Sequence, residues 1–406
     1  MSVLRRTVSI VKNRRRGPSA EQRAELQAVL DNAAAMTAKR QEPRRHHLVP
    51  RFYLNEWAVE GQVQVTDLSQ QRKTFTVRPE QALVETDFYR INEDMVDGGS
   101  PVAWESWLSN VEAIAAPLLP IVRDHGLHTL PLEDQGRFLQ FVAVQITRCR
   151  YYRLQGRWML GAGYYRMWEL DRPGAIAGHL RDRSTEPTPE LVAALQEYFD
   201  RVVQDPWKAM FSPELEMDAS MRGANALLPD LAGRTTVTFT SAAPLLTTDE
   251  PVTLLAEHHG DMTSPHSGWH GAPIIAMPLG PHHVLALFRR DLPAVDVQRP
   301  LSRSDSLELN RVLLGNAHRH TVSVPGDKLA ERLYVPDEKA PVRLRKVRTG
   351  DGRSFLQTIP MRRWSGERDA PQRPVSFWWP PVLPPAPTVP STAEEWEAER
   401  LRYYDT

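Results

Sequence analysis

Helical and strand-like patterns are segregated along this chain of 406 residues, and that order restricts its fold more than any other feature. Apolar residues recur at helical spacing through most of the first half, whereas alternating runs typical of strands dominate from Arg234 to Phe288. A doubly wound parallel sheet needs strands and helices to alternate, so the segregation predicts an α+β fold. We expect a helix-rich domain packed with a small mixed or antiparallel β-sheet.

Caps, breaks and periods place the individual elements. Alternation between Val63 and Val77 predicts a small hairpin. A long helical region is expected from about Leu132 to Trp168, and Ser302 with Asp305 caps another helix that should run from Leu307 to about His320. Further helices are expected at 21–39, 101–116 and 189–203.

Composition divides the chain into four parts. Residues 1–45 form a basic N-terminal arm with a helix, carrying eleven basic and four acidic side chains, and the remainder is acidic because the whole chain has a formal net charge of +0. Residues 46–325 are expected to form the core domain, followed by a C-terminal extension at 326–370. The tail at 371–406 begins with eight prolines in twenty residues, which disfavours helix and central strand, and it ends in a short helix.

The composition also disfavours several classes of protein. No apolar run reaches the roughly 20 residues that a membrane helix needs, so no membrane partner is expected. The single cysteine, Cys149, cannot form an internal disulfide and suits a reducing compartment, so a cytoplasmic location is expected. Neither GxxxxGK[ST] nor GxGxxG occurs, which removes the simple nucleotide-binding fingerprints.

Two polar residues interrupt an apolar helical stripe. Gln145 and Arg148 share the side of their helix that Phe138 and Val142 mark as inward. A buried arginine without a partner costs several kcal/mol, so Arg148 predicts a carboxylate or an anionic ligand nearby. A satisfied internal hydrogen bond is the plainer explanation for both side chains.

Three further residues are candidates for a site. Asn316 lies among the apolar positions of the last long helix, and its amide needs partners if it is buried. Asp249 follows a strand-like run, at a place where loops carry function on a rigid support. His47 stands at the entry of an ordered element and could be a metal ligand, a general base or a packed ring. A structural hydrogen bond or cap remains the alternative for each.

The run HLVPRFYLNEW at His47 to Trp57 resembles the HxxPxxYLxxF signature of a mostly bacterial family known as domain of unknown function 4238. Other stretches are similar to that family in the same order, across about residues 46–320. They are DFYRI at 87–91, the helix at 104–111 with Glu112, QITR at 145–148, TTDEPV at 247–252, MPLGP at 277–281 and LNRVLLGNAHRH at 309–320. Two residues depart from the pattern: Trp57 stands where Phe is usual, and Glu250 where Asn is common.

The resemblance implies that His47, Arg148, Asp249 and Asn316 occupy motif positions of the family. On that basis the hypothetical catalytic residues are His47, Asp249 and Arg148. The hypothetical ligand-binding residues are Asn316, Gln145 and Glu112. His47 and Asp249 are the candidate ligands for a metal, and a divalent ion is the cofactor that such side chains could accept.

Two functional hypotheses follow. The first is a metal-dependent hydrolase acting on nucleic acid or another phosphate-containing substrate. The HHLVP run also resembles the opening of an HNH endonuclease motif, but after Asn55 no histidine occurs until His125, too far for a compact metal site. The second is a noncatalytic module that senses an anion or binds protein, with a structural buried polar cluster.

The expected partners are a small or phosphate-bearing ligand, nucleic acid at the basic arm and a protein at the proline-rich tail. Solvated surface charge and a stiff spacer are the plainer explanations for arm and tail. Six of the thirteen histidines lie between His258 and His283, but Gly and Pro interrupt that segment, which favours chance surface histidines over a helical metal site.

Overall fold

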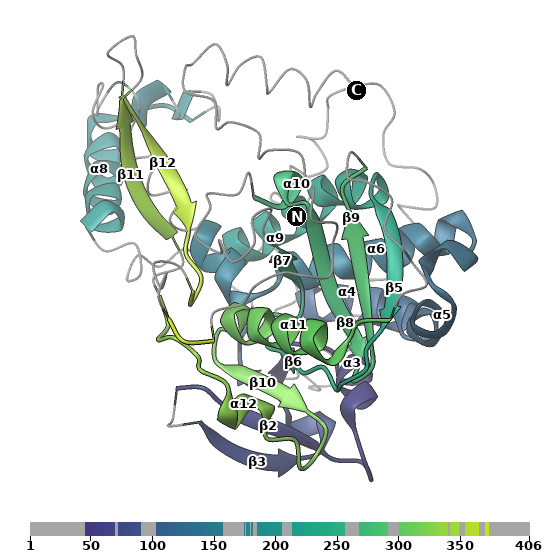
Figure 1. The fold of residues 1–406 in the computed structure, drawn as a ribbon. Helices are drawn as coiled ribbons and strands as arrows, with labels where there is room; N and C mark the ends of the chain where they lie inside the picture. Colours follow the sequence, from purple (N-terminus) through teal and green to yellow (C-terminus); the bar gives the residue numbers. More distant parts are fainter. Residues whose placement is uncertain are drawn as a thin grey trace.

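The computed structural model describes residues 45–372 with gaps at 70–71, 91–102, 157–173, 175, 179, 182–184, 205–212, 256–267, 291–299, 340–341, 349–353 and 365–369. Figure 1 shows helices on both sides of a central sheet, with a second sheet below it. All strand pairs named within the described residues are antiparallel. The predicted α+β class is therefore confirmed.

The central sheet has the strand order β5-β9-β8-β7. Its strands are β5 (Thr235–Thr240), β9 (His283–Phe288), β8 (Ile274–Gly280) and β7 (Thr253–Leu255). Both faces of β8 are buried, because successive side chains point to opposite sides and every residue of the strand is buried. The sheet is therefore the middle layer of a three-layer arrangement.

One face of this sheet packs against the helices α4 (Ala103–Ala115), α5 (Leu118–His125), α6 (Leu132–Thr147) and α9 (Pro213–Ala232). Ile275 and Leu285 belong to that core, whereas their neighbours Ile274 and Val284 belong to the other core. The second core lies beneath α11 (Arg303–Asn316), which crosses in front of the sheet in Figure 1. Strand alternation thus divides the apolar residues between the two layers.

The second sheet has the order β3-β2-β10-β6. The predicted hairpin forms β2 (Val63–Asp67) and β3 (Lys73–Val77), and β10 (His320–Ser323) pairs with β2 on one side and with β6 (Thr247–Thr248) on the other. Because β10 joins two segments that are far apart in the sequence, the ends of β2 and β6 lie beside the start of β10.

A small β1–β4 ladder and the short helices after it begin the family-like region. Strand β1 (Arg45–His47) pairs with β4 (Val84–Thr86), and α3 (Arg51–Leu54) follows with η1 (Asn55–Trp57). Trp57 is fully buried, and its Nε1 donates to the carbonyl of Leu245 at 2.7 Å. A phenylalanine, which the resemblance leads one to expect here, could not make this bond.

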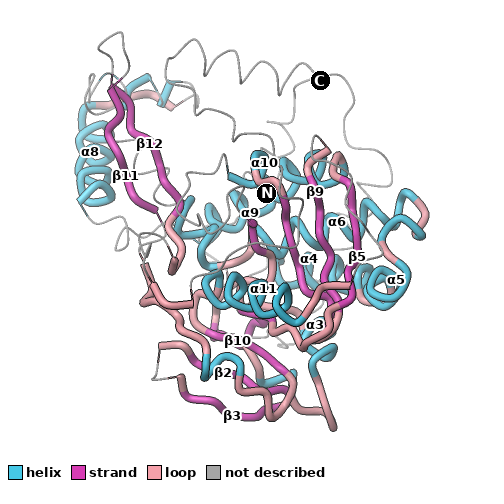
Figure 2. Tube along the Cα trace, viewed as in Figure 1, coloured by secondary structure: helices cyan, strands magenta, loops and turns pink. Residues whose placement is uncertain are grey.

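The remaining elements lie around this core (Figure 2). They are η2 (Pro79–Gln81), η4 (Leu127–Thr129), α8 (Pro189–Gln204), α10 (Gly268–Gly271), α12 (Leu329–Arg332), β11 (Val342–Arg348) and β12 (Ser354–Pro360). No helix in the described ranges has the length and apolar character needed to cross a membrane.

Two predicted helices end earlier than expected. The region predicted from Leu132 to Trp168 is interrupted at Arg148 and Cys149, and helix resumes at 150–156 before the chain leaves the described residues. The helix predicted to reach His320 ends at Asn316, because the β-branched run after it pairs with β2 and β6 instead. Ser302 and Asp305 do form the predicted capping box, so this helix begins at Arg303.

The chain after β12 returns to the core. Trp364 is fully buried, and its Nε1 donates to the carbonyl of Arg311 at 3.2 Å. Its indole covers Gly315 so closely that a Cβ at that position would lie 2.1 Å from Cδ1 of Trp364. Gly315 is therefore needed for the close approach of this segment to α11.

Candidate functional site

Arg148 is the centre of a buried polar cluster, which we call the Arg148 cluster: Arg148, Glu112, Tyr89, Glu105 and His47. The Arg148 side chain is 5% exposed. Its Nη1 lies 2.6 Å from Oε1 of Glu112, its Nε donates to the hydroxyl of Tyr89 at 2.9 Å, and its Nη2 donates to the carbonyl of His47 at 2.5 Å. The buried cation thus has the carboxylate that its position in the sequence predicted.

Glu105 precedes Glu112 by two helical turns on α4, so the two carboxyls share one face of that helix. Burial raises the pKa of Glu105 to about 7, the attraction of Arg148 opposes this shift, and the repulsion of Glu112 adds to it. Glu105 is therefore a carboxyl that gains and loses its proton near neutral pH, beside an ion pair. Sequence patterns do not single out Glu105, because a glutamate on an amphipathic helix gives no signal of its own.

The backbone carbonyl of His47 accepts a hydrogen bond from Arg148, and its imidazole takes no part in that bond. Its Nδ1 is buried and makes no hydrogen bond of normal geometry with the described residues. Burial lowers the pKa of His47, an interaction with the Ala82 backbone opposes the shift, and Arg148 reinforces it. The imidazole is accordingly neutral at pH 7 and can accept a proton.

Gln145 lies one turn before Arg148 on the same side of α6. The ring of Phe141, a turn earlier, lies 5.4 Å from that of Phe52, and Arg148 reaches His47, so Gln145 faces the segment between His47 and Phe52. It is 1% exposed, and neither its amide nitrogen nor its amide oxygen forms a hydrogen bond with a described residue. Such an amide can bind a water or a small polar ligand through its donors and its acceptor.

Both carboxylate oxygens of Asp249 accept hydrogen bonds from backbone nitrogens of the protein. Its Oδ1 accepts from the backbone nitrogen of His318 at 2.9 Å, and its Oδ2 accepts from those of Arg319 at 2.8 Å and His320 at 2.9 Å. The carboxylate therefore holds the turn between α11 and β10. Its place after a strand-like run predicts a role for Asp249, but the three backbone donors could not be predicted from the sequence.

Asn316 and Glu250 complete the same region. The amide nitrogen of Asn316 donates to the carbonyls of Glu250 at 2.7 Å and Val252 at 3.1 Å, so it binds the chain that leaves β6. Glu250 is 1% exposed; burial raises its pKa and Arg362 opposes this shift. Its Oε2 lies 2.8 Å from Nη1 of Arg362, a residue of the C-terminal extension.

The break in the helix after α6 connects these two regions. The chain bends at Arg148 and Cys149, so the backbone nitrogen of Tyr151 has no helical partner and donates to Oε1 of Glu250 at 2.7 Å. Glu250 thus caps the helix that resumes at Arg150. Arg148 binds the carbonyl of His47, and Asn316 binds the carbonyl of Glu250, the residue after Asp249. The bend links these two regions, because the nitrogen of Tyr151 binds Glu250.

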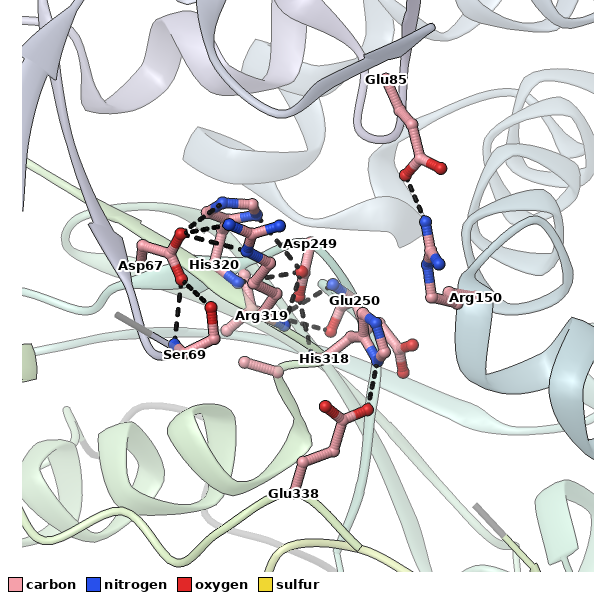
Figure 3. A network of polar contacts seen from close by, with 12 residues as sticks. Asp67, Ser69, Glu85, Arg150, Asp249, Glu250, His318, Arg319, His320 and Glu338 are labelled. Carbon is pink, nitrogen blue, oxygen red and sulfur yellow. Dashed lines mark hydrogen bonds and ion pairs between the residues drawn. The ribbon is translucent and has the colours of Figure 1, made fainter. Parts of the chain in front are cut away.

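Figure 3 shows the polar network at the start of β10. Arg319 makes two hydrogen bonds with Oδ2 of Asp67, at 3.0 and 2.7 Å, and His318 lies 3.0 Å from Glu338. The ring of His320 lies between two carboxylates, with Nε2 at 3.7 Å from Asp67 and Nδ1 at 3.8 Å from Asp249. Burial lowers the pKa of His320 and the two aspartates oppose that shift.

The residues present do not fit the metal site that the sequence suggested. His47 and Asp249 belong to different clusters, and no hydrogen bond or ion pair joins them within the described part of the chain. Both oxygens of Asp249 are occupied by backbone donors. Across the described ranges, no group of three or more His, Cys, Asp or Glu side chains is arranged to hold a metal ion.

Several predictions fall outside the described residues. They concern the basic arm before Arg45, the histidines at 258, 259 and 266, and the proline-rich tail from residue 373. The nucleic-acid and protein partners expected for the arm and the tail stay predictions.

Comparison with known proteins supports the resemblance given above. A family model described as "Protein of unknown function (DUF4238)" matches residues 45–327. No curated protein and no solved structure matches the chain. The match includes every residue of the Arg148 cluster and both Asp249 and Asn316, whereas Arg362 and Trp364 lie beyond its end.

Proposed function

The chain belongs to the DUF4238 family, and on that premise we propose that it is a hydrolase in which the Arg148 cluster performs acid–base catalysis. The observation that carries the proposal is the pair of titratable groups beside Arg148 whose pKa values are shifted in opposite directions. Burial lowers the pKa of His47 and raises that of Glu105 to about 7. Perturbed groups with separate environments are typical of acid–base pairs in active sites.

The two groups have complementary roles in this proposal. The neutral imidazole of His47 takes a proton from water while the water oxygen attacks the electrophilic atom of the substrate. Glu105, carrying its proton, gives that proton to the leaving group as the scissile bond breaks. Glu112 and Tyr89 act through Arg148, which holds the backbone of His47 and thereby positions its ring.

The buried amide of Gln145 also supports this proposal. Its buried, unpaired amide offers one acceptor and two donors to a polar molecule bound between α6 and the segment that follows β1. A single cysteine that is buried and free suits a reducing compartment, so the proposal places this activity in the cytoplasm.

The test is hydrolysis of a panel of chromogenic carboxylic esters, phosphomonoesters and phosphodiesters by the purified full chain. Glu105→Gln and His47→Gln should each lower kcat by about 100-fold or more on any substrate that is turned over. Glu133→Gln, an exposed glutamate on α6, is the matched control and should retain full activity. Hydrolysis that persists unchanged in Glu105→Gln and His47→Gln contradicts the assignment, and so does a folded wild type that hydrolyses no member of the panel.

A noncatalytic role is the second candidate, and one observation favours it. The polar atoms of Asp249, the amide of Asn316 and three nitrogens of Arg148 all bind groups of the protein itself. That is the arrangement of a structural polar core. Normal folding together with loss of every hydrolytic signal would favour this role over catalysis.

A further inference from the structure

Strand β1 presents a basic face beside His47. Along this strand Arg45 is exposed, His46 is buried and His47 is partly exposed. Because alternate residues of a strand share a face, Arg45 and His47 lie on the same accessible side. His46 points inward, where its Nδ1 accepts from the backbone nitrogen of Tyr89 at 2.8 Å.

Arg51 is a second cation that acts on His47. It begins α3 only four residues after His47, and its side chain is 60% exposed. Its contact with Glu80 is 3.6 Å long between two exposed side chains, so it neutralises little of the charge. Arg45 and Arg51 are both close enough to the imidazole to act on it electrostatically, together with Arg148.

The two exposed arginines, Arg45 and Arg51, differ from Arg148 in how many of their hydrogen-bond donors are already used by the protein. Arg148 is committed to Glu112, Tyr89 and the His47 carbonyl, so it has no role in holding a ligand charge. Arg45 is an exposed residue and the Arg51 side chain is 60% exposed, and the two lie on either side of His47 in the sequence. Exposed arginine forks next to a reacting group are suited to the oxygens of a phosphate.

We propose that the face formed by Arg45, His47 and Arg51 binds a phosphate group of the substrate, which makes the substrate class phosphate esters. This inference rests on the proposed hydrolase function, since it names the substrate of the same site. The phosphate oxygens bind the two guanidinium groups, and the ester bond lies toward the imidazole. Among the acidic residues around this face, Glu80 contacts Arg51, Glu85 lies opposite His46 on β4 and pairs with Arg150, and Glu112 is neutralised by Arg148.

The experiment is a titration of the full chain with inorganic phosphate at pH 7, followed by the NMR signal of the His47 ring and with sodium chloride at equal ionic strength as reference. Phosphate should give a saturable shift that chloride does not. The double variant Arg45→Gln/Arg51→Gln should bind phosphate about threefold to tenfold more weakly, a range expected for two exposed cations. Arg137→Gln, an exposed and ion-paired arginine on α6, should bind like the wild type.

Equal shifts with phosphate and chloride overturn the inference, and so does unchanged phosphate affinity in the double variant. Because binding is measured without turnover, the inference is separated from the proposed function. Saturable, arginine-dependent phosphate binding by a chain that hydrolyses nothing supports the anion site and contradicts the hydrolase. Hydrolysis of carboxylic esters alone, without phosphate binding, supports the hydrolase and contradicts the anion site.

Discussion

Nη1 of Arg362 lies 2.8 Å from Oε2 of Glu250, so a residue beyond the family-matched range neutralises a carboxylate buried within it. The guanidinium of Arg362 also lies over the ring of Tyr151, with 3.3 Å between its central carbon and the ring centroid. Arg363 adds hydrogen bonds to the carbonyls of Ala317 and Pro336, at 3.1 and 3.0 Å. The segment after β12 is therefore part of the same packed unit as the candidate site.

Replacing Arg148 should mainly lower the stability of the folded protein rather than remove a contact to a ligand. Arg148→Ala leaves Glu112 without its cation and should lower the free energy of unfolding by about 3–5 kcal/mol. Urea denaturation followed by circular dichroism measures this change. The double variant Arg148→Met/Glu112→Gln should recover part of the loss, because it removes both charges. Wild-type stability in Arg148→Ala would contradict the buried ion pair.

Asp249→Ala should destabilise the protein through the turn that precedes β10. It removes the acceptor of three backbone N–H groups at once and should cost about 3–5 kcal/mol in the free energy of unfolding. Asp134→Asn, which alters a partly exposed carboxylate on α6, is the control and should change stability by less than about 0.5 kcal/mol. Hydrogen exchange of the His318 to His320 amides should accelerate in Asp249→Ala and stay slow in the control.

Glu105→Gln should alter the pH dependence of stability in a defined direction. Burial raises the pKa of Glu105 from 4.5 to about 7, so the folded state binds the proton more tightly than the unfolded state. The stability that the protonated carboxyl contributes is present below about pH 4.5 and is lost as the pH rises through 7. Glu105→Gln should therefore match the wild type at pH 4 and exceed it at pH 8, by no more than about 3 kcal/mol. Parallel stability curves would refute the raised pKa.

Gln145→Met should increase stability in the absence of ligand. The substitution keeps the side-chain volume and removes an amide whose polar atoms are buried and unpaired, which should raise the free energy of unfolding by about 1 kcal/mol. Gln140→Met, at a partly exposed position of the same helix, is the control and should have little effect. A marked loss of stability in Gln145→Met would mean that an ordered water already satisfies the amide.

Gly315→Ala should dislodge the segment that carries Trp364. The new Cβ would lie 2.1 Å from Cδ1 of that indole, so either the indole or α11 has to move. We expect a loss of several kcal/mol, on the scale of overpacked or disrupted cores. Limited proteolysis should then cut the chain near residue 364 faster than in the wild type. Trp364→Ala in the same background should add little further loss, because Gly315→Ala has already displaced the indole.

Much of the fold was predictable because it depends on local patterns. The helical stripe of α6, the hairpin of β2 and β3, and the capping box at Ser302 and Asp305 each follow from residues a few positions apart. The helix α9 and the strand β10 escaped prediction. The first has a weakly amphipathic sequence, and the second becomes a strand only because β2 and β6 lie on either side of it.

By itself, the sequence determined that Arg148, Gln145 and Asn316 are buried and that the first of them needs an anion, because apolar periodicity marks a helix face and a buried charge cannot stay unpaired. Only the tertiary structure decided which groups these polar side chains bind. Glu112 binds Arg148 from another helix, Asp249 turns to the backbone of β10, and Arg362 reaches Glu250 from outside the family range. These contacts join segments that are far apart in the sequence, and local patterns carry no information about which distant segments become neighbours.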